Sequence, residues 1–247
     1  MADPARAVTI NAARTGASGA QIARTLHVAG YDLALHYRRS RGEMDALIAA
    51  LESARAGSTL AVQAELADVE NLPRLVSACV ARFDRIDALV NNASAFYATP
   101  VGSATPAQWD ELFASNARAP FFLTQGAAPQ QTNTRGSVVN IVDIYAERPL
   151  PGHPVYCMAK AALAMMTQAL ARELGPEIRV NGVAPGAVLW PESGKAHADQ
   201  VELVARTPLQ RAGAPDDVAP AVLFLLRAAP FPTGQILRID GGRSLAV

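Results

Sequence analysis

Short apolar runs alternate with longer helical patterns along the whole chain. The apolar runs are nearly continuous, as expected of strands that are covered on both faces of a parallel sheet. We predict strands at Ala7–Asn11, Asp32–Tyr37, Thr59–Glu65, Ala88–Asn91, Ser137–Asp143, Ile178–Val183 and Ile236–Ile239. Between them, apolar residues recur with helical spacing over Ala20–Ala29, Met44–Ser53, Leu72–Phe83, Ala107–Gln125, Val155–Leu174 and Asp216–Arg227.

Repeated strand–helix units with right-handed crossovers build one sheet that is covered by helices on both faces. The pattern therefore predicts an α/β fold, a doubly wound Rossmann-type domain with a mostly seven-stranded parallel sheet. No linker rich in Gly, Ser and Pro interrupts the alternation, so we expect residues 1–247 to form a single domain. Ligands of such sheets bind at the carboxyl ends of the strands, where we look for functional motifs.

Composition narrows the class of protein and its partners. Half of the residues are hydrophobic and 18% are charged, which is typical of a globular protein. The 22 basic residues balance the 22 acidic residues, so no overall field favours nucleic acid or an anionic membrane. The only cysteines, Cys79 and Cys157, form neither a zinc pattern nor a disulfide framework. We therefore expect no metal site. The sequence shows neither a signal peptide nor an apolar stretch of ~20 residues, so we expect a soluble cytoplasmic protein.

The turn after the first strand is a candidate phosphate site. Gly16 and Gly19 lie in a run of small residues that leads into the first helix. Small residues at this place let backbone N–H groups and a helix N-terminus approach a pyrophosphate. An ordinary strand-to-helix turn is the alternative.

The end of the second strand indicates which dinucleotide would bind. An NAD site usually places Asp or Glu there to hold the ribose hydroxyls, but no acid occurs between His36 and Arg41. Guanidinium groups suit a 2′-phosphate, so the sequence favours NADPH over NADH, and a solvated basic turn is the alternative. The candidate contacts are Tyr37, Arg38, Arg39 and Ser40.

Tyr156 and Lys160 open a long apolar helix and lie four residues apart, on one face of it. A free tyrosine has a pKa near 10, which is poorly matched to proton transfer at neutral pH. A nearby ammonium favours the phenolate and lowers that pKa. The pair is therefore a candidate acid–base centre, although this spacing also arises by chance.

Companion motifs make the pair more specific. The fourth strand ends in Asn91-Asn92-Ala93-Ser94, Asn116 lies in the next helix, and Pro185-Gly186 follows the sixth strand. With Tyr156 and Lys160, these motifs resemble the short-chain dehydrogenase/reductase family over nearly the whole chain. The resemblance implies that Tyr156 donates a proton, that Lys160 lowers its pKa and holds the nicotinamide ribose, and that Asn116 supports a water relay.

The same resemblance implies further cofactor contacts. Glu65 and Leu66 stand where an Asp-Leu pair usually contacts adenine. The first turn departs from the family pattern by an insertion or a local rearrangement, which puts its pyrophosphate contacts in question. The implied contacts are Arg14, Gly16, Gly19, Glu65, Leu66, Asn92, Ala93, Ser94, Tyr156, Lys160, Pro185 and Gly186.

Two residues point to a subgroup. Most family members carry a serine thirteen residues before the catalytic tyrosine, and Asp143 occupies that position. A carboxyl can accept a proton from a nitrogen heterocycle or protonate it, whereas the alternative is a strand-end Asp that makes a local turn. Phe96 could stack a flat substrate against the nicotinamide, and a core or lid phenylalanine is the alternative.

Together with the basic turn and Pro185–Pro191, these residues look like the pteridine reductases, which include enzymes that reduce dihydropterins and dihydrofolates. The resemblance implies hydride transfer from NADPH to a pterin C=N bond, with Tyr156 and Asp143 supplying the proton. Ser94 would hydrogen-bond both pterin and cofactor. Val188 and Trp190 would line the substrate side, within a loop at about 187–205 whose 192–200 segment looks like a lid.

Two other functions stay open on the sequence. A carbonyl reductase of the same family, for example on acyl-carrier-protein thioesters, is disfavoured by Asp143, whose carboxylate would repel a developing oxyanion unless it is protonated. A non-catalytic, cofactor-binding member could have lost turnover through the irregular first turn. The family commonly forms tetramers through its long helices, and Ala161–Leu174 is apolar on more than one face, so a homotetramer is expected.

Overall fold

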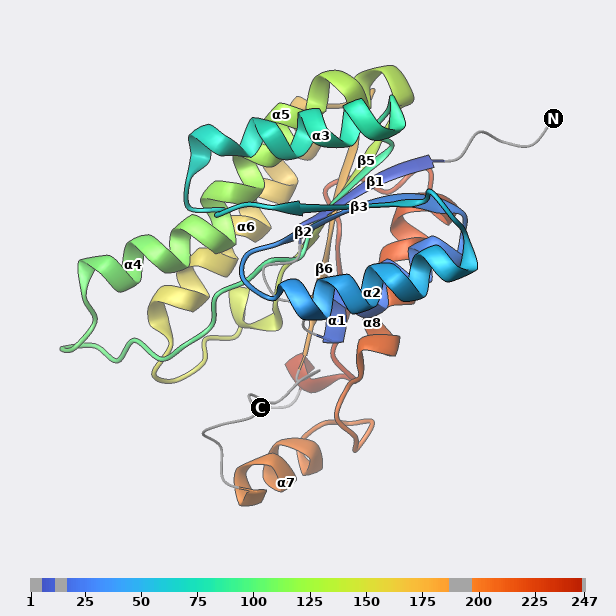
Figure 1. The fold of residues 1–247 in the computed structure, drawn as a ribbon. Coiled ribbons are helices and arrows are strands. Elements are labelled where there is room, and N and C mark those ends of the chain that lie inside the picture. Colours follow the sequence, from blue (N-terminus) through green and yellow to red (C-terminus); the bar gives the residue numbers. More distant parts are fainter. Residues whose placement is uncertain (1–5, 12–16, 187–196, 246–247) are drawn as a thin grey trace.

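The computed structural model describes residues 6–11, 17–186 and 197–245. Seven parallel strands form one sheet in the order β3-β2-β1-β4-β5-β6-β7 (Figure 1). The strands are β1 (Arg6–Asn11), β2 (Tyr31–Tyr37), β3 (Thr59–Gln63), β4 (Ala88–Asn91), β5 (Ser137–Ile141), β6 (Arg179–Pro185) and β7 (Ile236–Ile239). This order reverses between β1 and β4, which is the switch point of a doubly wound sheet.

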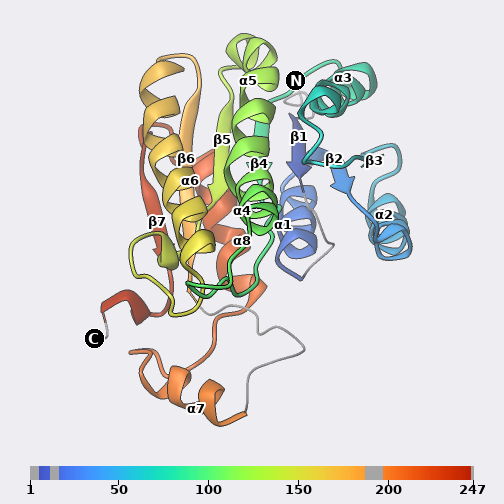
Figure 2. The ribbon, with the colours of Figure 1, turned by 90° about the vertical axis from the view of Figure 1, so that its left-hand side faces the viewer.

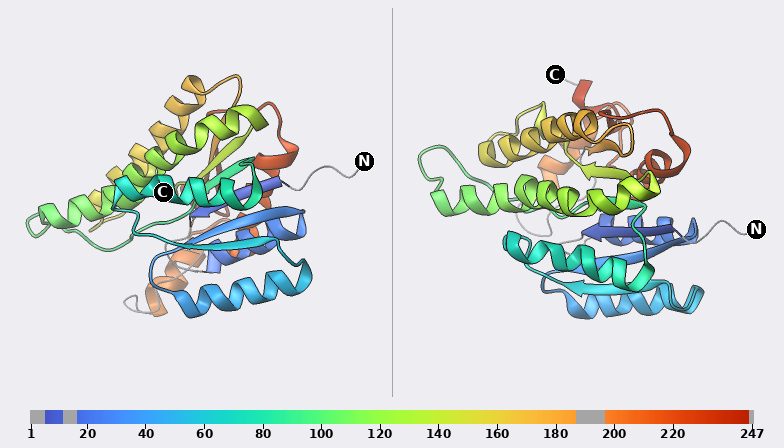
Figure 3. Two further views of the ribbon diagram at one scale, coloured as in Figure 1. Left: turned by 45° about the horizontal axis from the view of Figure 1, so that its top comes forward. Right: turned by 90° about the horizontal axis from the view of Figure 1, so that it is seen from above.

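Helices cover both faces of the sheet (Figure 3). They are α1 (Ala17–Val28), α2 (Arg41–Ala54), α3 (Leu72–Phe83), α4 (Pro106–Phe113), α5 (Ala119–Thr134), α6 (Pro154–Glu173), α7 (His197–Ala205) and α8 (Pro215–Leu223). In the described part of the chain, none of them is long and apolar enough to cross a membrane. The architecture confirms the predicted Rossmann-type α/β fold.

Two apolar cores lie on opposite faces of the sheet. On one face, β2 packs against α1, α2 and α8 through residues such as Leu26, Leu47 and Val222. On the other face, α3 and α5 pack against β4 and β5. Because the sheet is buried on both sides, its central strands can be apolar throughout, which explains why their pattern is a continuous run rather than an alternation.

The carboxyl ends of the strands meet at one edge of the sheet. In Figure 2 the arrows of β1 and β2 point toward the end of the molecule where α7 lies. Buried amides tie this region together, because Asn91 on β4 donates to Asn140 on β5 at 2.8 Å, and Asn140 donates to Thr167 on α6 at 2.9 Å. These bonds fix α6, which carries Tyr156 and Lys160, against the centre of the sheet.

The structure differs from the sequence prediction in several places. The strand predicted to reach Asp143 ends at Ile141, because the Asp143 side chain accepts a backbone hydrogen bond in the turn that follows. The single helix predicted at Ala107–Gln125 is α4 and α5 joined by a π-helical turn at Ala114–Arg118, and α5 continues through the polar residues Gln130–Thr134. The segment expected as a loop at 187–205 contains α7.

Candidate active site

Asp143 lies just beyond β5, with one carboxylate oxygen in a local turn and the other in the candidate site. Its backbone is extended, and Oδ1 accepts the backbone N–H of Tyr145 at 2.9 Å, which caps the 3-10 turn at Ile144–Ala146. Oδ2 accepts the phenolic O–H of Tyr156 at 2.7 Å. Asp143 therefore makes the local turn that was its alternative interpretation, and also faces the tyrosine.

Tyr156 lies in the first turn of α6, after Pro154 has preset the helical backbone at the N-terminus. Its side chain is only 4% exposed, and its hydroxyl points to Asp143. Burial, followed by the charge of Asp143, raises the pKa of the phenol well above its ordinary value. The neutral phenol is therefore the stable form at neutral pH, with its proton on Oη.

Lys160 follows one turn later on the same face of α6. It is 2% exposed, and its Nζ donates to the carbonyl oxygen of Ile141 at 2.9 Å. The ammonium lies 5.8 Å from the centroid of the Tyr156 ring. Burial lowers the pKa of Lys160 to about 8, and the charge of Asp143 opposes this shift.

The pKa of Tyr156 corrects one expectation from the sequence. We expected Lys160 to lower that pKa, whereas burial and Asp143 raise it. The physical reason is that the carboxylate contacts the phenol directly, while the ammonium is bound to a backbone carbonyl. Burial also raises the pKa of Asp143, against the hydrogen bonds from Tyr145 and Tyr156 and the charge of Lys160. Both acidic groups of the pair thus favour their protonated forms.

Asn116 anchors the segment that follows β4. It lies in the π-helical turn between α4 and α5, a rare local geometry that often occurs at functional sites. Its buried amide donates to the carbonyl oxygens of Leu112 at 2.9 Å and Ala95 at 3.0 Å. Its Oδ1 accepts the Ser94 hydroxyl at 2.7 Å. This geometry holds Ser94 and Ala95 in place, and the expected water relay through Asn116 stays a prediction.

Two rings form a wall beside the phenol of Tyr156. The ring of Phe96 lies edge-on to Tyr156, with centroids 4.8 Å apart and an interplanar angle of 82°. The imidazole of His153 stacks parallel to Phe96, also at 4.8 Å, with an angle of 9°. Phe96 is 40% exposed, so it is a wall residue rather than a core residue. A flat molecule beside Tyr156 would meet an aromatic surface.

A cleft of about 430 Å³ leads from this wall to the end of β2. It is lined by His36, Arg38, Arg39, Ser40, Glu65, Leu66, Ala67, Ser94, Ala95, Phe96, Tyr97, Glu111, Ala114 and Ser115. The cleft thus brings the basic turn, the Glu65-Leu66 pair and the substrate-side residues Ser94 and Phe96 into one space. An elongated ligand at the carboxyl edge of the sheet could contact both ends.

Other predicted contacts lie elsewhere. Tyr37 and Ala93 are buried in the two apolar cores and do not line the cleft, so packing accounts for both side chains. Asn92 is half-buried just after β4, and Gly19 is buried in the first turn of α1. Pro185 ends β6, and Gly186 follows it with no room for a side chain, because a Cβ there would lie 2.9 Å from Asp240.

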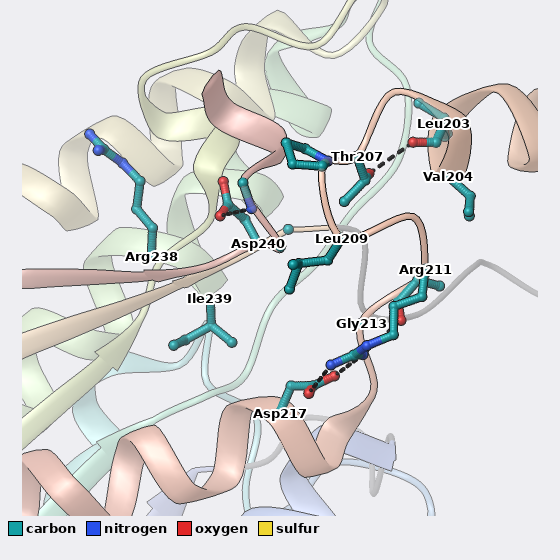
Figure 4. A pocket seen from close by; sticks show the side chains of 15 residues that line it. Leu203, Val204, Thr207, Leu209, Arg211, Gly213, Asp217, Arg238, Ile239 and Asp240 are labelled. Atoms are coloured by element: carbon teal, nitrogen blue, oxygen red, sulfur yellow. Dashed lines mark hydrogen bonds and ion pairs between the residues drawn. The ribbon is translucent and has the colours of Figure 1, made fainter. Parts of the chain in front are cut away.

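Gly186 lines a second cavity of about 450 Å³ beside the end of β7 (Figure 4). Leu203, Val204 and Leu209 supply apolar walls, while a two-bond ion pair joins Arg211 to Asp217. No residue of the Asp143–Tyr156–Lys160 group lines this cavity. Among the described residues, no three His, Cys, Asp or Glu side chains gather as a metal site.

Several predicted site residues lie outside the described residues. These are Arg14 and Gly16 in the first turn, and Val188 and Trp190 after β6. The proposed irregularity of the first turn and most of the expected lid at 192–200 fall in the same ranges.

The structure also brings in residues that sequence reasoning did not single out. Tyr145 holds Asp143 through its backbone, His153 stacks on Phe96, and the Ser115 hydroxyl accepts the backbone N–H of Ala95 at 3.2 Å. His153 precedes Tyr156 by three residues, and Ser115 directly precedes Asn116. Closeness in the sequence to the two motif residues was therefore the available signal for both.

Comparisons with known proteins cover nearly the whole chain. A family model described as enoyl-(acyl carrier protein) reductase matches residues 12–244. Pteridine reductase 1 of Leishmania tarentolae is 36% identical over 98% of this chain and 96% of that protein. A candidate ketoacyl reductase of the granaticin polyketide synthase from Streptomyces violaceoruber is also 36% identical, over 94% of each chain. The 3-oxoacyl-(acyl-carrier-protein) reductase of Staphylococcus aureus strain Mu50 is 31% identical over 95% of this chain and 98% of its own. The chain therefore belongs to the short-chain dehydrogenase/reductase family of oxidoreductases.

Proposed function

We propose that the protein is an NADPH-dependent pteridine reductase, which reduces a C=N bond of a pterin, dihydropterin or dihydrofolate. The observation that carries this proposal is the 2.7 Å hydrogen bond between Tyr156 and Asp143. A carboxyl beside the phenol provides two adjacent acidic groups, which suits protonation of a ring nitrogen. The similarity to pteridine reductase 1 of Leishmania tarentolae over nearly the full length of both chains also supports this proposal.

The cleft fits an extended dinucleotide. Its far end carries the guanidinium groups of Arg38 and Arg39, and its near end reaches Ser94, next to the wall around Tyr156. When bound, NADPH would supply the hydride that adds to the carbon of the C=N bond. Arg39 and Ser40 would hold the 2′-phosphate, while Lys160 would hold the nicotinamide ribose. Arg39 is exposed and forms no ion pair with a described residue, so its charge is free for a phosphate.

Tyr156 and Asp143 would deliver the proton. The high pKa of Tyr156 keeps a proton on Oη at neutral pH, ready for a basic nitrogen at hydrogen-bond distance. Asp143, whose pKa is raised by burial, can take a proton from solvent and return it to the phenol or pass it directly to the substrate. The ammonium of Lys160 stabilises the negative charge that the pair carries once the proton has left.

Phe96 and Ser94 would position the substrate ring. The exposed face of Phe96 offers a flat pterin a stacking surface, and the edge contact between Phe96 and Tyr156 keeps that surface next to the phenol. The hydroxyl of Ser94 is fixed by Asn116 and lies at the boundary between the cleft and the ring wall. A pterin bound there would place its ring nitrogens near both acidic groups.

Reduction of a 3-oxoacyl thioester is the second candidate function. Two of the similar proteins carry ketoacyl or 3-oxoacyl reductase names, which favours this activity. Ketone reduction develops an oxyanion next to the proton donor, and Asp143 would raise the energy of that oxyanion whenever the carboxyl is ionised, whereas a pterin ring can be met by the carboxylic acid at a basic nitrogen or by the carboxylate at an N–H. The position of Asp143 in contact with Tyr156 therefore favours the pterin.

We also propose that the protein assembles as a homotetramer. Phe121 and Phe122 on α5 and Met158 and Met165 on α6 are large apolar side chains that are exposed in the isolated chain. Burial of such residues against further copies would remove apolar area from water. Light scattering coupled to size-exclusion chromatography should give about four times the 26.0 kDa mass of one chain. A monomeric mass would contradict the assembly without affecting the proposed chemistry.

Steady-state assays test the proposed function. We expect kcat/KM with NADPH to be higher for dihydrobiopterin or dihydrofolate than for acetoacetyl thioesters, with little turnover when NADH replaces NADPH. Oxidation of the cofactor without substrate serves as the blank. A clear preference for the thioester would overturn the pteridine assignment and support the second candidate.

A further inference from the structure

The guanidinium of Arg38 is already paired inside the cleft. Its Nε donates to Oε2 of Glu65 at 2.5 Å, and both side chains line the cleft. The side chains of Arg38 and Glu65 are 39% and 44% exposed, so a ligand can reach both partners. The backbone carbonyl of Arg38 also accepts from the Gln63 amide at 3.1 Å, which ties the basic turn to the end of β3.

This pairing changes the charge that an incoming phosphate meets. Arg38 and Arg39 together carry two positive charges, whereas the adjacent carboxylate of Glu65 leaves the group with a net charge of one. Binding through Nε still leaves the Nη atoms of Arg38 available. A 2′-phosphate at these atoms would therefore lie close to the Glu65 carboxylate and would share Arg38 with it. Like charges at such separations repel, even in a solvated cleft.

We propose that Glu65 is a selectivity residue that competes with the 2′-phosphate of the cofactor for Arg38. Glu65 thereby weakens the binding of the phosphorylated cofactor and leaves Arg39 as the main phosphate contact. The unphosphorylated cofactor lacks the competing group, so Glu65 lowers the discrimination between NADPH and NADH. This inference rests on the proposed cofactor but is independent of the substrate.

Binding of two nucleotide fragments tests the inference without any turnover. Adenosine 2′,5′-bisphosphate carries the 2′-phosphate, and AMP is the matched fragment without it. Isothermal titration would compare both fragments on the wild type, Glu65→Gln, Arg38→Ala and the double variant. Glu111→Gln is the matched control, because Glu111 lines the same cleft and its replacement changes the net charge equally.

Glu65→Gln should bind the bisphosphate about threefold to fivefold more tightly, the range expected for one exposed ion pair. Any change at the adenine contact affects both fragments alike, so the ratio of the affinity for the bisphosphate to that for AMP should rise by the same threefold to fivefold, and this rise should vanish when Arg38 is also Ala. Glu111→Gln should show no such rise. The inference is overturned if this ratio is unchanged or lower in Glu65→Gln, or if the rise persists without Arg38.

Failure of the proposed function would look different. A wild type that binds AMP as tightly as the bisphosphate would contradict the NADPH preference. A wild type that reduces no pterin would contradict the pteridine assignment. In both cases the change caused by Glu65→Gln would still report on the competition for Arg38.

Discussion

Tyr156 and Asp143 share a hydrogen bond of 2.7 Å across the boundary between α6 and the end of β5. Asp143 disfavours ionisation of Tyr156 beyond the effect of burial, whereas the hydrogen bond from the phenol favours the carboxylate form of Asp143. The pair therefore carries at most one negative charge at neutral pH. The backbone N–H of Tyr145 fixes the second oxygen of Asp143, which leaves Oδ2 aimed at the phenol. The pair is thus a proton-holding unit whose carboxyl is positioned by the backbone.

Replacement of Tyr156 by Phe removes the proton donor and preserves the ring that packs against Phe96. We expect turnover to fall by about a hundredfold to ten-thousandfold, the usual loss of a general acid. Affinity for NADPH should stay within about twofold, because a single hydroxyl is a small part of the expected contact surface. Stopped-flow turnover and a fluorescence titration measure the two quantities.

Tyr31→Phe is the matched control for this variant. Tyr31 is buried at the start of β2, far along the strand from the carboxyl edge, and its loss of a hydroxyl should leave turnover unchanged. Unchanged turnover in Tyr156→Phe would remove Tyr156 from the chemistry.

The buried ammonium of Lys160 should lower the free energy of unfolding at neutral pH. Burial lowers its pKa from 10.5, the ordinary value of a lysine in an unfolded chain, to about 8 in the folded protein. Below pH 8 both states are protonated, so folding buries a charge at a cost of about 3 kcal/mol. The cost disappears as the pH rises from about 8 to 10.5. Lys160→Met should therefore be more stable than the wild type by about 2 kcal/mol at pH 7, after loss of about 1 kcal/mol from the bond to Ile141.

Urea unfolding at pH 7 and at pH 10 without cofactor measures this difference. The gain of Lys160→Met should shrink at the higher pH, and the variant should lose turnover at both. A variant that is less stable at pH 7, or a difference that does not change with pH, would contradict the buried charged state of Lys160.

Phe96 should control the affinity for flat substrates. Phe96→Leu keeps an apolar side chain and removes the stacking face, so KM for a dihydropterin should rise about threefold to tenfold. The turnover number should change little, because the proton donors are untouched. His153→Ala should cause a smaller rise in KM, since His153 supports the ring from its other face. An equal rise in KM for an aliphatic thioester would contradict the stacking role.

The fold could be predicted from the sequence, and much of the site could not. Continuous apolar runs predict buried parallel strands, and the ends of β4 and β7 agree with the predicted residues. Tyr156 and Lys160 were recognisable because a helix brings residues four apart onto one face. The end of β5 was missed by two residues because the capping bond from Asp143 to Tyr145 competes with the strand.

Contacts between distant segments left no local signal. Arg38 and Glu65 are 27 residues apart, and their ion pair depends on β2 and β3 being neighbours in the sheet. The stack of Phe96 on His153 likewise joins two turns that meet only in the folded chain, where the N–H of Thr99 donates to the carbonyl of Gly152 at 2.8 Å. The π-helical turn at Asn116 cannot be seen in a pattern with helical spacing, because it is a single turn between two α-helical segments and has no repeat of its own.

Arg39 should determine the preference for the phosphorylated cofactor. Arg39→Ala should weaken NADPH binding about tenfold, which is typical for loss of one charge-assisted hydrogen bond, and should leave NADH binding unchanged. The effect should decrease at high salt, because Arg39 is exposed. Arg74→Ala, an exposed arginine on α3, serves as the control. Equal losses for the two cofactors would refute the phosphate contact.

The exchange of Asp143 for serine, the residue common in the family, tests the central claim most directly. The measurement is the ratio of kcat/KM for dihydrobiopterin to kcat/KM for an acetoacetyl thioester, in the wild type and in Asp143→Ser. Loss of the second acidic group should lower this ratio by about a hundredfold, the smaller end of a general-acid effect. A ratio that stays the same, with both proteins folded and binding NADPH equally, would contradict the role of Asp143 in protonating the pterin.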